Sequence, residues 1–289
     1  NKRRETLLAN KDKALLSKQL VTLKDDVPVK NDPNEFLIKD IDKDKLYDFL
    51  REMEFNRLLS NVISFYGESD NKESYKEISS KKSFKIERKF YKSIVKLKDF
   101  EDLIEELNKK SVIAVDTETS SLNPHEAELI GVSLSYAPNI SFYIPLGHKG
   151  VKGIKKDLVL KKLRTILEDS SIKKVGQNIK YDFIIFKNHG IELNSIDDTM
   201  LLSYTLDAGN NRHNMDTLSE LHLGHKTISY KDLVGTGKKQ LNFSDIDLKS
   251  ATEYAAEDAD VTLRLYNILS ERVSEEKLDK IYEVFEKPM

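Results

Sequence analysis

The chain has 289 residues, enough for one large domain or for one domain with appendages. Its net charge of −2 does not by itself indicate a nucleic-acid partner, so such a partner would be bound by local basic patches or through metal ions. No apolar run approaches the roughly 20 residues of a membrane span, and the absence of cysteine excludes disulfides and thiolate metal sites. We therefore expect no membrane partner, and the composition fits a reducing cytoplasm.

The first 66 residues are expected to form short helices. Leucines recur at helical spacing between residues 15 and 23, and amphipathic segments follow at 46–53 and 55–63. These pieces are too short to bury an independent core. Residues 67–83 are polar, with mixed charge and few apolar side chains, which is typical of a linker.

A compact domain is expected over residues 84–284. An amphipathic helix at 97–107 precedes three apolar segments of strand character, and these strands would form a meander. A mostly helical remainder follows a further helix and a short strand. This order predicts an α/β fold with a mixed sheet. The expected strands are 90–95, 112–117, 129–135, 141–145 and 173–176, and the further helix is 158–167.

The apolar run that begins at Val112 ends in two carboxylates, Asp116 and Glu118. Residues i and i+2 of a strand point to the same side, so the two acids project together. Their repulsion must be offset, and divalent cations such as Mg²⁺ and Mn²⁺ prefer hard oxygen ligands of this kind. The motif is weak alone, because a polar strand end with two solvated acids has the same pattern.

Two later segments add acids to this pair. Asp182 lies in the first turn of a helix that follows a strand end, where it could also simply interact favourably with the helix dipole. Asp258 and Tyr254 are four residues apart in a helix expected from about residue 249 to about 269, so they share one face. The alternative there is a half-buried tyrosine beside a solvated acid.

Four carboxylates and a tyrosine fit a site for two divalent metal ions that promotes phosphodiester hydrolysis. Asp116 would bridge both ions. Glu118 and Asp258 would bind the first ion, and Asp182 would hold the second through water. The Tyr254 hydroxyl and Glu118 would orient the attacking water. We therefore expect two Mg²⁺ ions, with Mn²⁺ able to substitute.

The order D-x-E, N-x-x-x-D and Y-x-x-x-D resembles the DEDDy branch of the 3′–5′ exonucleases, which have a ribonuclease-H-like fold. The neighbouring residues are similar to the proofreading domain of bacterial DNA polymerase I, over segments 115–122, 175–182, 198–204, 212–218, 225–228 and 254–262. This resemblance implies an exodeoxyribonuclease that removes nucleotides from the 3′ end of single-stranded or mismatched DNA during replication and repair in the bacterial cytoplasm.

The resemblance also implies how the chain is divided. Residues 1–66 are similar to the helical tail of a 5′-nuclease domain, and 84–284 to the exonuclease domain. Residues 285–289 look like the start of a polymerase domain that is missing. We therefore expect a monomeric fragment whose partners are DNA and the other two domains of the same parent chain.

Further positions match residues that bind the strand in that family. Leu122 and Asn178 would contact the terminal nucleotides, and Tyr230 would stack on the strand. Arg212 and His213 would reach phosphates. Lysines at 226, 231, 238 and 239 surround Tyr230, and a basic loop with an aromatic is a single-strand signature, although ordinary surface has the same composition.

Two alternatives remain open. One is an RNA 3′–5′ exonuclease like ribonuclease D, which uses the same acids. The other is a catalytically silent domain that only supports the polymerase. The presence of all four acids and the tyrosine favours an active nuclease.

Overall fold

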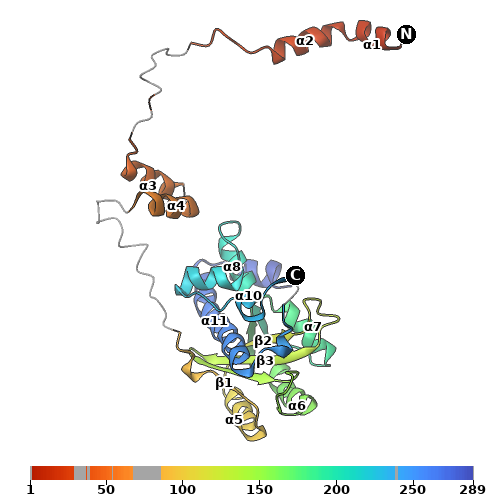
Figure 1. The fold of residues 1–289 in the computed structure, drawn as a ribbon, viewed down its shortest axis with the longest axis vertical. Helices are drawn as coiled ribbons and strands as arrows, with labels where there is room; N and C mark the ends of the chain where they lie inside the picture. The colour runs from red at the N-terminus through yellow and green to blue at the C-terminus, as the bar shows by residue number, and fades with distance from the viewer. Residues whose placement is uncertain are drawn as a thin grey trace. The chain divides into compact units, whose positions relative to one another are not determined.

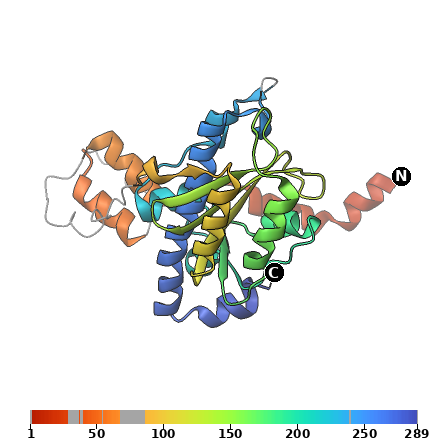
Figure 2. The same ribbon diagram turned by 90° about the horizontal axis from the view of Figure 1, so that it is seen from below.

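A computed structural model of the chain describes residues 2–28, 37, 40–53, 55–67, 86–237 and 240–288 (Figures 1 and 2). The chain divides into two compact units, Asn1–Glu77 and Ile78–Met289. The linker predicted at 67–83 lies outside the described residues, except for Gly67. Within the ranges just given, no helix is both long and apolar enough to span a membrane.

The first unit contains four described helices: α1 Lys2–Ala9, α2 Lys11–Val21, α3 Lys43–Glu52 and α4 Asn56–Tyr66. No described residue of α1 or α2 is buried. Helix α3 begins where the Asp42 side chain accepts a hydrogen bond from the Lys45 amide at 3.1 Å. Tyr47, Leu50 and Leu59 then form a small cluster between α3 and α4.

The second unit is organised around one six-stranded mixed sheet with the order β1-β4-β3-β2-β5-β6. Strands β2, β3 and β4 pair antiparallel as a meander, whereas β5 pairs parallel with β2 and β6 parallel with β5. The carboxyl ends of β2 and β5 therefore meet at the same edge of the sheet. The strands are β1 Lys92–Ser93, β2 Val112–Thr119, β3 Leu129–Ala137, β4 Ile140–Pro145, β5 Lys173–Gly176 and β6 Ile196–Asp198.

Helices cover both faces of this sheet (Figure 1). Apolar residues of α5, α6 and α7 pack with the sheet in one core cluster, and the long α11 crosses the opposite face (Figures 1 and 2). The helices are α5 Leu97–Leu107, α6 Lys156–Leu167, α7 Lys180–Asn188, α8 Thr199–Asp207, α9 Met215–Leu218, α10 Tyr230–Val234, α11 Leu248–Glu275 and α12 Asp279–Ile281.

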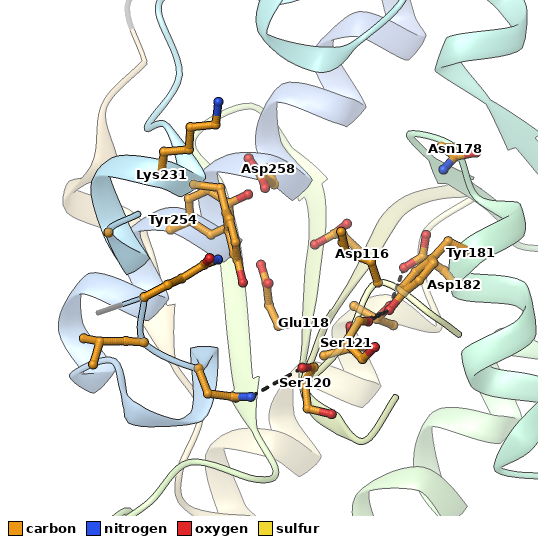
Figure 3. A pocket seen from close by; sticks show the side chains of 18 of the residues that line it. Asp116, Glu118, Ser120, Ser121, Asn178, Tyr181, Asp182, Lys231, Tyr254 and Asp258 are labelled. Atoms are coloured by element: carbon orange, nitrogen blue, oxygen red, sulfur yellow. Dashed lines mark hydrogen bonds between the residues drawn. The ribbon is translucent and has the colours of Figure 1, made fainter. Parts of the chain in front are cut away.

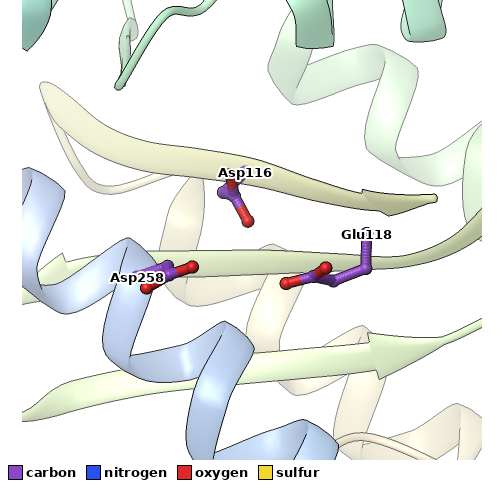
Figure 4. Close-up of side chains that lie close together, drawn as sticks. All are labelled: Asp116, Glu118 and Asp258. Atoms are coloured by element: carbon purple, nitrogen blue, oxygen red, sulfur yellow. The ribbon is translucent and has the colours of Figure 1, made fainter. Parts of the chain in front are cut away.

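The side chains of β2 alternate between the two faces of the sheet, so the strand contacts the helices on both sides. Ile113 and Val115 belong to the cluster shared with α5, α6 and α7. Asp116 and Glu118, offset by one residue, face the other way, toward α11 (Figure 4). The alternation therefore separates an apolar face from an acidic one on a single strand.

The α/β fold with a mixed central sheet is confirmed, and three elements differ from expectation. Strand β1 has only two residues, because Arg88–Phe90 forms a separate turn. Strand β6 was not predicted, since its three residues include two acids and show no apolar pattern. Helix α11 continues past the expected end near residue 269 to Glu275, and Val273 in this extension is buried in a second core cluster.

Gly131 on β3 gives a test of this packing. A Cβ atom there would overlap the ring of Tyr143, which is fully buried. We expect Gly131→Ala to destabilise the protein by about 2 kcal/mol, the usual cost of overpacking a core. Thermal and urea unfolding measure this loss.

The matched control is Tyr143→Leu, which shortens the obstructing side chain. The double variant should be more stable than the sum of the two single losses predicts. Strict additivity would contradict the proposed overlap.

Candidate active site

A cavity of about 650 Å³ opens at the carboxyl edge of β2 and β5 (Figure 3). Its walls come from the end of β2 and the loop after it, the turn between β5 and α7, the α10 region and α11. The residues named in the sequence analysis that line it are Asp116, Glu118, Leu122, Asn178, Asp182, Tyr230, Lys231, Tyr254 and Asp258. Volumes of this order are typical of small-molecule sites.

Three carboxylates converge in this cavity (Figures 3 and 4). Asp116 and Glu118 project from β2, and Asp258 projects from α11. One carboxylate oxygen from each lies within 4.8 Å of the others. Glu118 and Asp258 are buried, and Asp116 is half-buried.

The fourth acid, Asp182, enters from the first turn of α7. Its Oδ1 accepts a hydrogen bond from the Thr117 hydroxyl at 2.6 Å. Thr117 lies between Asp116 and Glu118 in β2 and faces the α7 side of the sheet. Asp182 is therefore fixed against the same strand as the other acids, but from the opposite face.

The pKa values of all four acids are raised. Burial raises the pKa of Asp116 to about 6, against an opposing hydrogen bond from Ser133. Burial, followed by the charge of Asp116, raises the pKa values of Glu118, Asp182 and Asp258. Such raised values mark a site where charged carboxylates need a compensating positive charge.

Tyr254 closes the α11 side of the cavity. Burial, and then the charge of Asp258, raises the pKa of its hydroxyl, so the phenol stays protonated at neutral pH. Its ring centroid lies 5.9 Å from that of Tyr230 and 6.1 Å from that of Phe243. Tyr230 and Phe243 are parallel within 3°. Tyr230 and Tyr254 thus form an aromatic wall beside the acids, with Phe243 packed behind them.

Only some of the residues predicted to bind the strand lie at the cavity. Leu122 is 94% exposed on the rim, and Asn178 and Tyr230 also line the cavity. Arg212 and His213 are not among the described residues that line it. The His213 Nδ1 instead pairs with the Ser203 hydroxyl at 2.9 Å. Lys238 and Lys239 lie outside the described residues.

Thr117, Tyr181 and Asp198 were missed by the sequence analysis, although each supports a site residue. The Tyr181 hydroxyl pairs with Thr119 and with the Ser121 carbonyl, which holds the loop after β2.

The Asp198 carboxylate accepts hydrogen bonds from the amides of Asn178 at 3.0 Å and Ile179 at 2.9 Å. It thereby fixes the turn in which Asn178 has a φ of 59°. Only Asp198 had a recognisable signal, as an acid directly before a helix.

This donor set fits divalent cations that prefer oxygen. The converging ligand atoms are carboxylate oxygens, and their raised pKa values show that they repel one another. Asp116, Glu118 and Asp258 could bind one ion directly. Mg²⁺ and Mn²⁺ match such ligands.

Sequence comparison identifies related proteins. A 3′–5′ exonuclease family of the family A DNA polymerases matches residues 91–274. The chain is 36% identical to DNA polymerase I of Rhizobium leguminosarum over 100% of its length, and 34% identical to that of Borreliella burgdorferi over 99%. It covers 36% and 32% of these relatives, about a third of their length.

Comparison with solved structures agrees on the fold. Escherichia coli RNase D superposes with a TM-score of 0.52 at 20% identity, covering 66% of this chain and 48% of that one. The Aedes aegypti Nibbler EXO domain has a TM-score of 0.53 at 15% identity, covering 70% and 97%. At these identities the likeness concerns the fold alone.

The raised pKa values predict how stability depends on pH and metal. A carboxyl whose pKa is higher in the folded state binds more protons there, so stability falls as pH rises from about 4 through the raised values. In EDTA, Asp258→Asn should therefore stabilise the protein at pH 8, because the amide carries no charge that burial and the charge of Asp116 would disfavour. The gain should shrink at pH 5.

Thermal unfolding at the two pH values, with EDTA or with Mg²⁺, measures this effect. Mg²⁺ should stabilise the unmodified protein more than the variant. A variant that is less stable than the unmodified protein in EDTA at pH 8 would contradict the electrostatic account.

Proposed function

The chain belongs to the 3′–5′ exonuclease family of bacterial DNA polymerase I, and from this premise we propose that it removes nucleotides from the 3′ end of single-stranded or mismatched DNA. One observation carries the proposal. Three buried or half-buried carboxylates converge within 4.8 Å in a cavity whose rim carries an exposed leucine and an aromatic wall. Acids of this kind suit phosphodiester hydrolysis, and the apolar rim suits unpaired bases.

The acids have separate tasks in this proposal. Asp116 would be shared by two Mg²⁺ or Mn²⁺ ions, Glu118 and Asp258 would hold the first, and Asp182 would hold the second through water. When bound, the two ions stabilise negative charge on the attacking and leaving oxygens. The Thr117 hydroxyl keeps the Asp182 carboxylate in one orientation.

Tyr254 and Glu118 orient the attacking water. Because its pKa is raised, the Tyr254 hydroxyl remains a hydrogen-bond donor and does not act as a base at neutral pH. It can therefore fix the position of a water molecule without removing its proton. Leu122, Asn178 and Tyr230 hold the terminal nucleotides beside these groups, and Arg212 with His213 contacts phosphates farther along the strand.

The proposal extends to the parent protein. Residues 1–66 form the end of a 5′-nuclease domain, 67–83 a linker, 84–284 the exonuclease domain and 285–289 the start of a polymerase domain. The matches to DNA polymerase I over the whole chain support this division. We place the protein in the bacterial cytoplasm as a monomer, acting in DNA replication and repair.

An RNA exonuclease is the less favoured reading. The RNase D likeness rests on the fold at 20% identity, whereas the polymerase relatives are 34–36% identical. Rates on DNA and RNA strands of the same sequence separate the two readings, and faster hydrolysis of RNA would reverse the preference.

Asp116→Ala and Asp258→Ala test the metal site. Each should lower hydrolysis by several orders of magnitude because a direct metal ligand is lost, while circular dichroism shows an intact fold. Asp102→Ala removes an exposed acid of α5 and serves as the control. Full activity in a folded Asp116→Ala variant would refute the site assignment.

Substrate form is the second test. Threading a 3′ end past Leu122 and Tyr230 requires unpaired bases, and opening duplex DNA costs about 1.4 kcal/mol per base-pair step. Each step that must open therefore slows hydrolysis about tenfold. We expect single strands to be degraded fastest, mismatched ends more slowly and matched duplex slowest, with a smaller difference at higher temperature.

A gel assay with 5′-labelled strands at two temperatures measures these rates. Binding should also weaken modestly with salt, because with a net charge of −2 only the local basic loop is expected to contact phosphates. Equal rates on single strand and blunt matched duplex at the lower temperature would exclude this mode of selection.

A further inference from the structure

Glu257 directly precedes Asp258 in α11 but points about 100° away around the helix. Its side chain is fully buried, and a buried carboxylate without partners would be strongly destabilising. Its Oε1 accepts hydrogen bonds from Arg88 Nε at 2.9 Å, Arg88 Nη2 at 2.6 Å and His225 Nε2 at 2.9 Å. Its Oε2 accepts from the Ile228 amide at 2.7 Å.

These bonds join α11 to the segment that enters α10. His225 and Ile228 lie in an irregular stretch that ends two residues after Ile228, where α10 begins at Tyr230. The Ser219 hydroxyl donates to the His225 carbonyl at 2.8 Å, and the Thr227 hydroxyl donates to Asp216 at 2.6 Å. Side-chain contacts from outside the segment therefore hold it in place.

Helix α10 needs such anchors because it has only five residues. A single turn fixes several backbone angles for one hydrogen bond, so it is not stable without tertiary contacts. Tyr230 is the first residue of this turn, and its ring, 39% exposed, lines the cavity. The position of that ring depends on where the turn is held.

We infer that Glu257 is a positioning residue, which, through His225 and the Ile228 amide, holds Tyr230 where its ring stacks on a base of the bound strand. The inference rests on the proposed function, because it assumes that Tyr230 contacts the strand. Glu257 belongs to the same helix as Tyr254 and Asp258, so one rigid element places both Asp258 and the stacking ring. Movement of α11 would shift both together.

His225 offers the cleaner substitution, since changing Glu257 would also alter the electrostatics of Asp258. His225→Leu removes one donor to Glu257, whereas the amide of His225→Gln can place an N–H near the position of Nε2. For single-stranded DNA, we expect His225→Leu to raise KM about five- to tenfold. This is the lower part of the range by which loss of a base-stacking aromatic weakens binding. The change in kcat should be smaller than the change in KM. His225→Gln should restore most of the loss.

If His225→Leu does not fold, His225→Asn provides the same test with a polar side chain too short to reach Glu257. Arg272→Gln is the control, because it breaks ion pairs with Asp207 and Glu276, none of which lines the cavity. This variant should lose stability without a change in KM.

The decisive measurement is a double-mutant cycle with Tyr230→Ala. If His225 acts through Tyr230, His225→Leu should have no further effect on KM in that background. A DNA strand with 2-aminopurine at its 3′ end, bound in EDTA, should show the matching loss of fluorescence quenching in both single variants.

Equal effects of His225→Leu with and without Tyr230 would overturn the inference, since the network would then be merely structural. Binding in EDTA does not require hydrolysis. If binding in EDTA shows the coupling between His225 and Tyr230 but the protein does not hydrolyse DNA in Mg²⁺, only the proposed reaction is refuted. If the protein binds DNA without that coupling, only the inference is refuted. Failure to bind DNA would refute both.

Discussion

Repulsion among four carboxylates at one edge of a sheet is the constraint on which this structure depends. Burial raises the pKa values of all four, and the charge of Asp116 adds to this at the other three, so the folded chain opposes its own ionisation there. A flexible site would relax by moving the acids apart. Here the acids lie on a strand with neighbours on both sides and on two helices packed against that strand. The frame therefore maintains an arrangement that becomes favourable when a cation binds or the acids take up protons.

Close approach of α11 makes this arrangement possible. The helix meets the sheet through small side chains, since Ala251 and Ala255 are fully buried in a cluster with Ile130 of β3 and Tyr143 of β4. Short side chains at the contact allow the helix axis to lie near the strands. Asp258 follows Ala255 by three residues on the same side of the helix and reaches the acids of β2. The alanines thus determine the distance across which the metal ligands converge.

The sequence predicted those parts whose signals are local. Strand alternation paired Asp116 with Glu118, and helical spacing paired Tyr254 with Asp258. The network around Glu257 could not be predicted, because Arg88 and Glu257 are 169 residues apart. Strand β6 was missed for a similar reason, since its pairing with β5 and not its composition makes it a strand. Contacts between distant segments leave no periodic pattern.

Strand β2 also explains why the four acids are not equivalent. Asp116 and Glu118 use one face of the strand, while Thr117, on the other face, engages Asp182 Oδ1. Asp182 also stands outside the set of three carboxylates whose oxygens converge within 4.8 Å of one another. The arrangement therefore supports the proposal that Asp182 acts through water, whereas Asp116, Glu118 and Asp258 bind directly. The face of β2 that each acid contacts would then decide whether it binds a metal ion directly or through water.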